Sequence, residues 1–200
     1  MFIQMIEGST NDPDAVHRQI EVWQRDLMPS AIGYLGSAGG CTSSGDCILI
    51  ARFESAEAAQ ANSERPEQSQ WWQATEACFD GPVTFHESSD VQVMTHGPMD
   101  DARFIQVMAG HVTDKARAVA LEREADPVLA EVRPDLLGAV TAYFGDDRFT
   151  ELAYFKSEAD ARRGEEQAMD GDMAAKMSEW QSVMKVERFL DINEPWLVSR

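Results

Sequence analysis

The stretch Phe2-Ile3-Gln4-Met5-Ile6-Glu7-Gly8 returns as Phe104-Ile105-Gln106-Val107-Met108-Ala109-Gly110, an offset of 104 − 2 = 102 residues. The block Ala51-Arg52-Phe53-Glu54-Ser55 returns at the same offset as Ala153-Tyr154-Phe155-Lys156-Ser157. Between these blocks, Pro29 and Gly33 correspond to Pro134 and Gly138 at an offset of 105, as expected when loops change length between homologous copies. Similarity at a fixed offset indicates an internal repeat. The sequence therefore predicts two tandem domains, residues 1–95 and 103–200, with a linker near residues 95–102.

Each copy has the pattern strand, helix, strand, strand, helix, strand. In the first copy, Asp12-Pro13 is typical of a helix start, and apolar residues from Val16 to Leu27 form one helical stripe. The expected strands of this copy are 2–7, 32–36, 47–53 and 83–87, and its helical segments are 12–27, 55–61 and 67–78. The glycine- and serine-rich stretch 39–46 is expected to close a hairpin.

The second copy repeats the pattern. Its expected strands are 104–109, 137–143, 150–155 and 186–191, and its helices are 114–133 and 157–184. Pro127 lies inside the first of these helices and predicts a kink or break, because proline lacks the backbone N–H. An antiparallel sheet with helices on one face leaves the other face uncovered, so two copies are expected to pack sheet against sheet.

Composition narrows the classes of partner. The 17 Lys and Arg against 35 Asp and Glu give a net charge of −18, which repels nucleic acid and anionic lipid surfaces. The start of the chain is apolar but short and has no preceding basic residue, which is typical of a strand rather than a signal peptide. We therefore expect a cytoplasmic protein that binds neither nucleic acid nor membranes.

The three cysteines, Cys41, Cys47 and Cys78, are odd in number and show no C-x-x-C spacing. This pattern predicts neither a disulfide framework nor a structural zinc site, and it favours reduced, inert thiols. No metal site is expected, since the sequence His86-Glu87-x-x-Asp90 is too loose a pattern for a set of ligands.

The βαββαβ order, the Phe-Ile-Gln opening and the Ala-x-Phe-x-Ser step into the second helix resemble the dimeric α+β barrel superfamily, specifically its antibiotic-biosynthesis-monooxygenase-like group. The resemblance covers nearly the whole chain. It implies an α+β fold of two tandem ferredoxin-like βαββαβ units, with antiparallel sheets packed face to face as a pseudo-dimeric α+β barrel. Members of the superfamily include cofactor-free monooxygenases, haem-degrading enzymes, isomerases and proteins with no assigned activity.

The chemistry that the resemblance implies is incomplete in this chain. Haem-degrading relatives use an Asn late in the first strand and a histidine on the long helix, whereas Glu7 and Ala109 occupy the strand region here and no histidine accompanies Trp71 or Trp180. No cofactor is therefore expected. Cofactor-free relatives use an Asn and a Trp near the second helix, a region that holds Asn62, Trp71 and Trp72.

Strand alternation suggests which residues line an interior. With Ile3, Met5, Ile105, Val107, Ala51, Phe53, Ala153 and Phe155 under the helices, the opposite parity places Phe2, Gln4, Ile6, Phe104, Gln106, Met108, Ile50, Arg52, Leu152 and Tyr154 toward the barrel. Of these, Gln4, Arg52, Gln106 and Tyr154 are candidate ligand-binding residues. The alternative is that the two glutamines hydrogen-bond each other or water in a filled core.

His86 is the candidate catalytic residue, because a strand histidine facing a cavity could act as acid or base near neutral pH. A satisfied structural histidine is the alternative. Trp71 and Trp72 are candidate ligand contacts, although neighbouring helical residues point in different directions and at least one is expected in the core. These residues lack counterparts in the second copy, so any cavity is expected nearer the first.

Three functions stay open. The favoured one is a non-catalytic small-molecule-binding or stress-associated protein with a pocket for a hydrophobic or aromatic molecule. The first alternative is a cofactor-independent monooxygenase-like or isomerase-like enzyme acting on an aromatic compound. The second alternative is a structural module with a filled barrel, and a homodimer is compatible with each of them. Fold alone does not choose among these functions.

Overall fold

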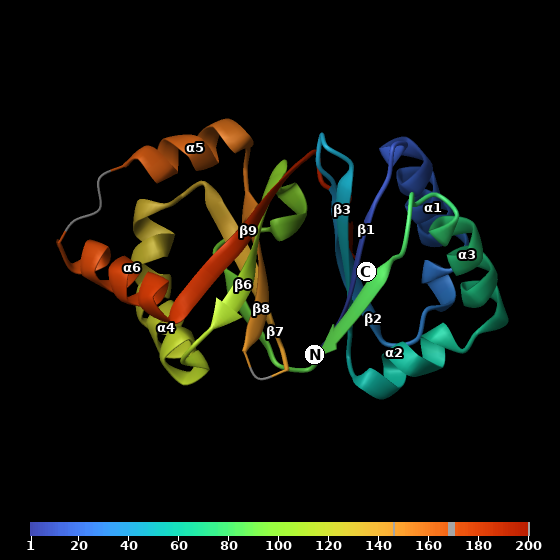
Figure 1. Cartoon of the computed structure of the whole chain (residues 1–200), viewed down its shortest axis with the longest axis horizontal. Helices are drawn as coiled ribbons and strands as arrows, with labels where there is room; N and C mark the ends of the chain where they lie inside the picture. Colours follow the sequence, from blue (N-terminus) through green and yellow to red (C-terminus); the bar gives the residue numbers. More distant parts are fainter. Residues whose placement is uncertain (146, 168–170, 200) are drawn as a thin grey trace. The chain divides into compact units, whose positions relative to one another are not determined.

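The computed structural model describes residues 1–145, 147–167 and 171–199. The chain divides into two compact units (Figure 1). The first unit comprises Met1–Ser89 with Glu194–Arg200, and the second comprises Asp90–Asn193. Residues 90–95 thus belong to the second unit, and residues 194–200 belong to the first. The sequence repeat instead places residues 90–95 in the first domain and residues 194–200 in the second.

The first unit has a five-stranded antiparallel sheet with helices on one face (Figure 1). Its strands are β1 (Phe2–Ser9), β2 (Tyr34–Cys41), β3 (Asp46–Phe53), β4 (Thr84–Ser88) and β10 (Val198–Ser199), and its α-helices are α1 (Pro13–Asp26), α2 (Ala56–Ser63) and α3 (Pro66–Glu76). A short 3-10 helix, η1 (Met28–Ser30), follows α1. The expected cap is confirmed, because the Asp12 side chain accepts a hydrogen bond from the Ala15 N–H at 3.0 Å.

The second unit repeats this architecture. Its strands are β5 (Val91–Thr95), β6 (Phe104–Val112), β7 (Leu136–Phe144), β8 (Arg148–Phe155) and β9 (Met184–Asn193), and its helices are η2 (Met99–Asp101), α4 (Lys115–Val132), α5 (Glu158–Glu166) and α6 (Gly171–Val183). Asp114 caps α4 as Asp12 caps α1, at the offset of 114 − 12 = 102 residues. Helix α4 continues through Pro127, so of the predicted kink or break the break does not occur. The expected helix 157–184 contains α5 and α6, separated by a stretch that includes residues outside the described part of the chain.

The two sheets exchange their last strands. The strand orders are β10-β2-β3-β1-β4 and β5-β7-β8-β6-β9. Strand β5 directly follows β4 in the chain but pairs with β7, and β10 follows β9 but pairs with β2. Each sheet therefore gains an edge strand from the segment that follows the fourth strand of the other copy.

The faces of the first strand in each copy are the reverse of those expected. Phe2 pairs with Phe53, and Phe104 pairs with Phe155. Directly paired residues of an antiparallel ladder share a face, so Phe2 and Phe104 lie under the helices and not on the opposite face. Packing agrees, because Phe2 and Phe53 share a buried cluster with Trp23 of α1. The same parity places Gln4, Ile6, Gln106 and Met108 on the helix-covered faces.

Cys41 and Cys47 form a disulfide, which corrects the expectation that all thiols are reduced. The two residues face each other at the end of the β2–β3 hairpin, with Cα atoms 4.0 Å apart. Strand β2 runs on through Gly39 and Gly40, which leaves only residues 42–45 to close the hairpin. The tight hairpin brings the two thiols together, and Cys78 is the free cysteine.

Membrane-spanning character is not seen in the helices that the structure describes, none of which combines the length and apolar composition needed to cross a bilayer.

Candidate functional site

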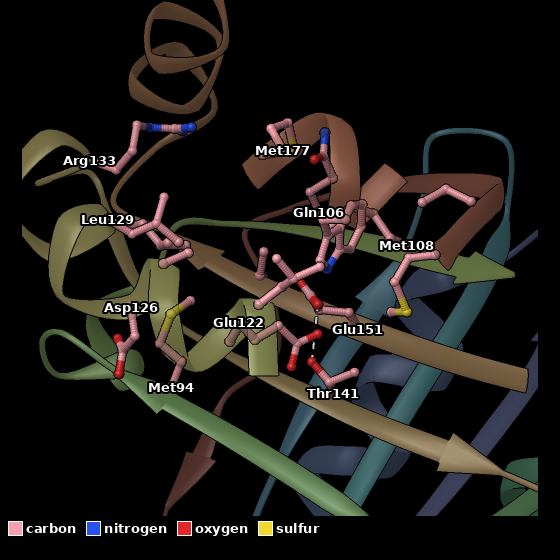
Figure 2. A pocket seen from close by; sticks show the side chains of 18 of the residues that line it. Met94, Gln106, Met108, Glu122, Asp126, Leu129, Arg133, Thr141, Glu151 and Met177 are labelled. Carbon is pink, nitrogen blue, oxygen red and sulfur yellow. Dashed lines mark hydrogen bonds between the residues drawn. The ribbon is translucent and has the colours of Figure 1, made fainter. Parts of the chain in front are cut away.

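A cavity of about 940 Å³ lies in the second unit, between the helix-covered face of its sheet and helices α4, α5 and α6 (Figure 2). Most of its wall is apolar, with several methionines and aromatic rings. These apolar lining residues include Met94, Met108, Leu129, Phe155, Met173, Met177, Trp180 and Phe189. The sequence places any cavity nearer the first copy, so this cavity corrects that expectation.

Glu151 places a carboxyl group on the floor of this cavity. Strand alternation on β8 directs Glu151, Ala153 and Phe155 toward the helices. Glu151 lies opposite Met108 of β6 and opposite Thr141 of β7. The Thr141 hydroxyl donates a hydrogen bond to Glu151 Oε2 at 3.0 Å. The carboxyl group is therefore oriented by a buried hydroxyl in the middle of the sheet.

Glu122 brings a second carboxyl group to the same place from helix α4. The Tyr143 hydroxyl donates to Glu122 Oε1 at 3.5 Å, and the Trp180 side chain also hydrogen-bonds this carboxyl group. Figure 2 shows Glu122 and Glu151 beside Thr141, on the same side of the cavity. Two acidic groups from two elements thus share one mostly apolar space.

Burial and mutual repulsion perturb these groups. Burial raises the pKa of Glu122 to about 7, and the nearby charge of Glu151 adds to the rise, while hydrogen bonds from Trp180 and Tyr143 oppose it. Burial also raises the pKa of Glu151, and the Thr141 hydrogen bond opposes this effect. The pKa of the Tyr143 hydroxyl is raised by burial first and by Glu122 second. Glu122 can therefore take up or release a proton near neutral pH.

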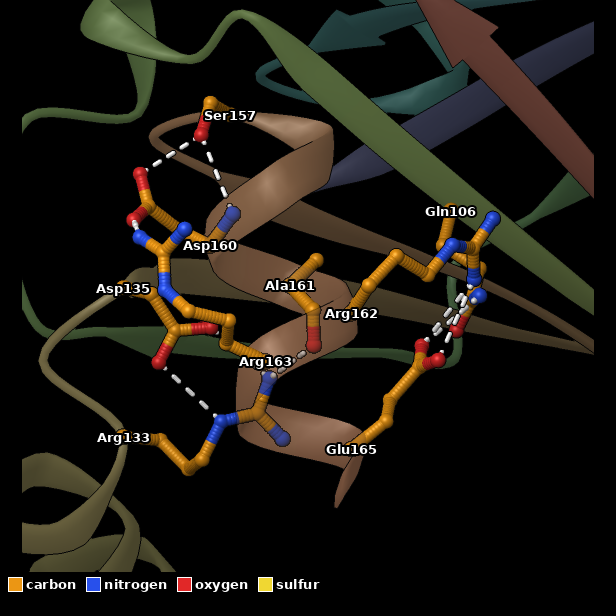
Figure 3. A network of polar contacts seen from close by, with 9 residues as sticks. All are labelled: Gln106, Arg133, Asp135, Ser157, Asp160, Ala161, Arg162, Arg163 and Glu165. Carbon is orange, nitrogen blue, oxygen red and sulfur yellow. Dashed lines mark hydrogen bonds and ion pairs between the residues drawn. The ribbon is translucent and has the colours of Figure 1, made fainter. Parts of the chain in front are cut away.

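The outer part of the cavity carries paired charges (Figure 3). Gln106 Nε2 donates to Glu165 Oε1 at 3.2 Å, and Arg162 pairs with both Glu165 and Asp191. Arg133 forms a two-pronged ion pair with Asp135, at 3.0 and 2.8 Å. These cations are matched by acidic partners away from Glu122 and Glu151.

The aligned positions of the first copy are apolar or lack a side chain. At the offset of 102 residues, Glu122 aligns with Ile20 (122 − 102 = 20) and Glu151 with Leu49. Strand pairing extends this offset to β2 and β7, because Gly39 lies opposite Leu49 as Thr141 lies opposite Glu151. Gly138 therefore corresponds to Gly36, which corrects the offset of 105 that the sequence predicted for this strand. Ile20 and Leu49 pack in an apolar cluster with Val16, Phe79 and Cys47. The same fold therefore forms without acidic residues at these positions, which identifies them as a specialisation of the second copy.

Among the sequence-predicted residues, Gln106 lines the cavity. Its repeat counterpart Gln4 donates to Glu87 Oε1 at 2.8 Å in the first unit. His86 Nε2 lies 3.7 Å from Glu7 Oε2. Arg52 pairs opposite Ile3 in the first sheet.

Arg52 and Tyr154 lie on the sheet faces turned away from the helices, because they pair with Ile3 and Ile105. Tyr154 is buried opposite Ile105 in the second sheet. Tyr154 and the candidates of the first unit do not line this cavity.

The two adjacent tryptophans have different environments. Trp71 packs against the core cluster of the first unit, and its indole N–H donates to the Gln19 carbonyl oxygen at 2.7 Å. Trp72 packs edge-to-face on Phe85, with ring centroids 4.9 Å apart. Trp71 is thus the one of the two that packs against the core, while itself only partly buried. Neither lines the cavity of the second unit.

Sequence reasoning did not identify Glu122, Glu151 or Thr141 as site residues. A signal was present, because the repeat alignment replaces Ile20 and Leu49 of one copy with acids in the other. Within the described part of the chain, no group of three or more His, Cys, Asp or Glu residues is arranged to hold a metal ion.

Comparison with known proteins reveals similarity at the level of structure. No family model and no curated protein matches this sequence. An anthrone oxidase-like protein superposes with a TM-score of 0.67 and 12% identity, covering 100% of this chain and 91% of the other. A protein of Lactobacillus acidophilus described as a monooxygenase gives a TM-score of 0.71 at 13% identity, covering 99% and 96% of the two chains. A protein of Fusobacterium nucleatum with the same description gives 0.74 at 8%, covering 100% and 94%.

The chain has the fold of these monooxygenase-like proteins. The matches extend over both repeat copies, so they confirm the tandem α+β architecture inferred from the sequence. At such low identity the similarity establishes the fold alone, and the chemistry of the chain depends on its own residues.

Proposed function

We propose that this protein binds a hydrophobic or aromatic small molecule in the cavity of its second unit. The observation that carries the proposal is the cavity of about 940 Å³, large enough for a molecule of several fused rings and lined mainly by apolar side chains. Methionine-rich walls adapt their shape to a flat or irregular ligand. The repeat copies add support, because Glu122 and Glu151 of the cavity replace Ile20 and Leu49, which pack in an apolar cluster of the first copy.

Filling the cavity tests this proposal. Ala153 lies on the floor and Met177 lies on helix α6, and both line the cavity. Ala153→Phe and Met177→Trp should each weaken binding of a fluorescent naphthyl probe by about tenfold or more, because the added rings occupy ligand volume. Met177 is only half-buried, so its variant should fold even if Ala153→Phe does not. Unchanged probe affinity in a folded Met177→Trp protein would contradict the proposal.

A second candidate function is cofactor-independent oxygenation, and Glu122 favours it. A carboxylate with a pKa of about 7 in an apolar cavity can remove a proton from a carbon acid beside an aromatic ketone. The resulting carbanion would react with dioxygen, converting a CH₂ group to C=O with release of one water molecule per O₂. The neighbour described as anthrone oxidase-like supports anthrone as the first compound to assay.

Oxygen consumption with anthrone tests the second candidate. Glu122→Gln should lower the enzyme-dependent rate by about a hundredfold, because the amide cannot accept the proton. Glu131→Gln is a matched control, since Glu131 lies on the same helix but is exposed and does not line the cavity. Oxygen uptake that is unaffected by Glu122→Gln would eliminate this residue as the base.

A further inference from the structure

The carboxyl pair of the cavity has no positively charged partner among the described residues. Thr141 hydrogen-bonds Glu151, and Tyr143 and Trp180 hydrogen-bond Glu122. The ion pairs of the described residues include neither Glu122 nor Glu151. Among these residues, no Lys, Arg or His nitrogen therefore lies within 4.0 Å of either carboxyl group. An acidic pair in a mostly apolar cavity, without a cation, is destabilising unless it is protonated or a ligand brings the charge.

The basic residues around the cavity are occupied elsewhere. Those with a defined partner are Arg133 (with Asp135), Arg162 (with Asp191 and Glu165), Lys176 (with Glu124) and Lys185 (with the Gln181 carbonyl oxygen). Arg123 is exposed on α4. Lys115 pairs with Asp90 at 2.5 Å and lies over the Tyr143 ring. The basic residues around the cavity are thus paired elsewhere, and the two carboxyl groups inside it have no cationic partner among the described residues.

The first copy shows that the fold does not require this pair. Ile20 and Leu49, the aligned residues, fill the corresponding space as part of an apolar cluster. Acidic side chains at two positions that are apolar in the other copy reduce the stability of the folded protein. Residues that cost stability are typical of functional sites, so we expect the two glutamates to contact a ligand. The cavity is the independent observation here, since it provides the volume that such a ligand would occupy.

We propose that this cavity selects small molecules with a hydrophobic body and a positively charged nitrogen, such as an ammonium group, which binds to Glu122 and Glu151. The inference rests on the proposed small-molecule-binding function and specifies its ligand class. Trp180, which also lines the cavity, supports it, because aromatic rings attract organic cations. Hydrogen bonds from ammonium to carboxylate are stronger than those between neutral groups.

Binding of the cation depends on pH in a defined direction. In the unliganded cavity Glu122 has a pKa of about 7, so it is largely protonated at pH 6 and largely ionised at pH 8. An ammonium group prefers the ionised form, and its affinity should rise by about tenfold between these pH values. Glu151 of β8 and Tyr143 of β7 are the other titratable groups beside Glu122. The remaining charged lining residues are Arg123, Asp126, Arg133, Arg162, Glu165, Lys176, Lys185 and Asp191.

Three matched naphthyl probes test the inference on the full-length protein. Naphthylmethylamine carries the ammonium group, naphthylmethanol is a neutral analogue, and naphthoic acid carries a negative charge. At pH 8 the amine should bind at least about tenfold more tightly than the alcohol, and the acid should bind most weakly. Calorimetry in two buffers of different ionisation enthalpy should show proton release when the wild-type protein binds the amine at pH 7.

Variants identify the groups responsible. Glu122→Gln and Glu151→Gln should each reduce the preference for the amine over the alcohol, and the double variant should abolish this preference. Glu131→Gln should leave the preference unchanged. Because the calorimetric proton release is measured on the wild-type protein, the test does not depend on the folding of any variant.

The outcomes separate the two proposals. If the alcohol binds and the amine binds no more tightly, the cationic class is wrong while the small-molecule site stands. If the acid binds most tightly, the cationic class is also wrong. If none of the three probes binds to the wild-type protein, both proposals fall.

Discussion

Thr141 and Glu151 face each other across strands β7 and β8, and the Thr141 hydroxyl donates to Glu151 Oε2 at 3.0 Å. In the first copy the aligned pair is Gly39 and Leu49, which cannot form this hydrogen bond. The interaction therefore accompanies the acidic residue and is specific to the copy that contains the cavity. It stabilises a carboxylate that burial alone would disfavour.

Removing this hydroxyl should raise the pKa of Glu151. Thr141→Val keeps the size of the side chain but removes the donor that favours the charged carboxylate. The pKa of Glu151, followed by carbon-13 NMR of the labelled carboxyl group, should be higher in the variant than in the wild-type protein. Thr150→Val is the control: Thr150 is also buried and directly precedes Glu151 on β8. This variant should leave the pKa of Glu151 unchanged. An unchanged pKa in Thr141→Val would show that the hydrogen bond does not form in solution.

The stability of the protein should fall as pH rises through the titration of Glu122. Its pKa is raised from the ordinary value of 4.5 to about 7, so the folded state binds this proton more tightly than the unfolded state. The favourable contribution is complete below about pH 4.5 and is lost by about pH 7, with an upper limit of about 3 kcal/mol. Denaturant unfolding of the wild-type protein and Glu122→Gln at pH 5 and 8 measures the difference.

The Glu122→Gln variant should lack this part of the pH dependence, so it should gain stability relative to the wild-type protein at pH 8. Glu131→Gln controls for general charge effects. A pH dependence that is identical in wild-type and Glu122→Gln proteins would refute the raised pKa.

The Cys41–Cys47 disulfide should stabilise the first unit. Cross-linking a short hairpin removes conformational freedom from the unfolded chain, and a loop of this size corresponds to about 2 kcal/mol. Reduction, or the double substitution of Cys41 and Cys47 with Ser, should lower the free energy of unfolding by about this amount. Cys78→Ser is the control. Thiol titration of the denatured, unreduced protein should detect Cys78 alone, and a count of three thiols would contradict the disulfide.

The adjacent tryptophans should differ in their contribution to stability. Trp71→Ala removes a ring packed against the core cluster together with its hydrogen bond to Gln19, and it should cost about 3 kcal/mol. Trp72→Ala removes mainly the contact with the half-exposed Phe85 and should cost about 1 kcal/mol. Equilibrium unfolding measures both. Equal losses would show that the core assignment of Trp71 is wrong.

Local patterns in the sequence predicted most of the secondary structure. The apolar stripe after Asp12 predicts α1, and the apolar stretch from Phe2 to Glu7 predicts β1. These features depend on neighbouring residues, so a single chain segment contains the information. The repeat offset extends the same prediction from one copy to the other, and it also aligns Glu122 and Glu151 with apolar residues.

Four features depended on pairings that local sequence patterns do not specify. Strands β5 and β10 are short, and each is defined by hydrogen bonds to a partner strand from the other repeat copy. The cysteine pair depends on where the hairpin closes, and the orientation of β1 depends on its register with β3.

The sequence by itself determined the duplication, the order of the elements and the α+β class, because periodicity and repeat offset are local or linear properties of the chain. Only the tertiary structure decided that the cavity lies in the second copy and that two glutamates meet there. Glu122 and Glu151 are 29 positions apart (151 − 122 = 29) on a helix and a strand, and packing of α4 on the sheet brings their carboxyl groups together. Their raised pKa values follow from this burial and proximity, which exist only in the folded protein.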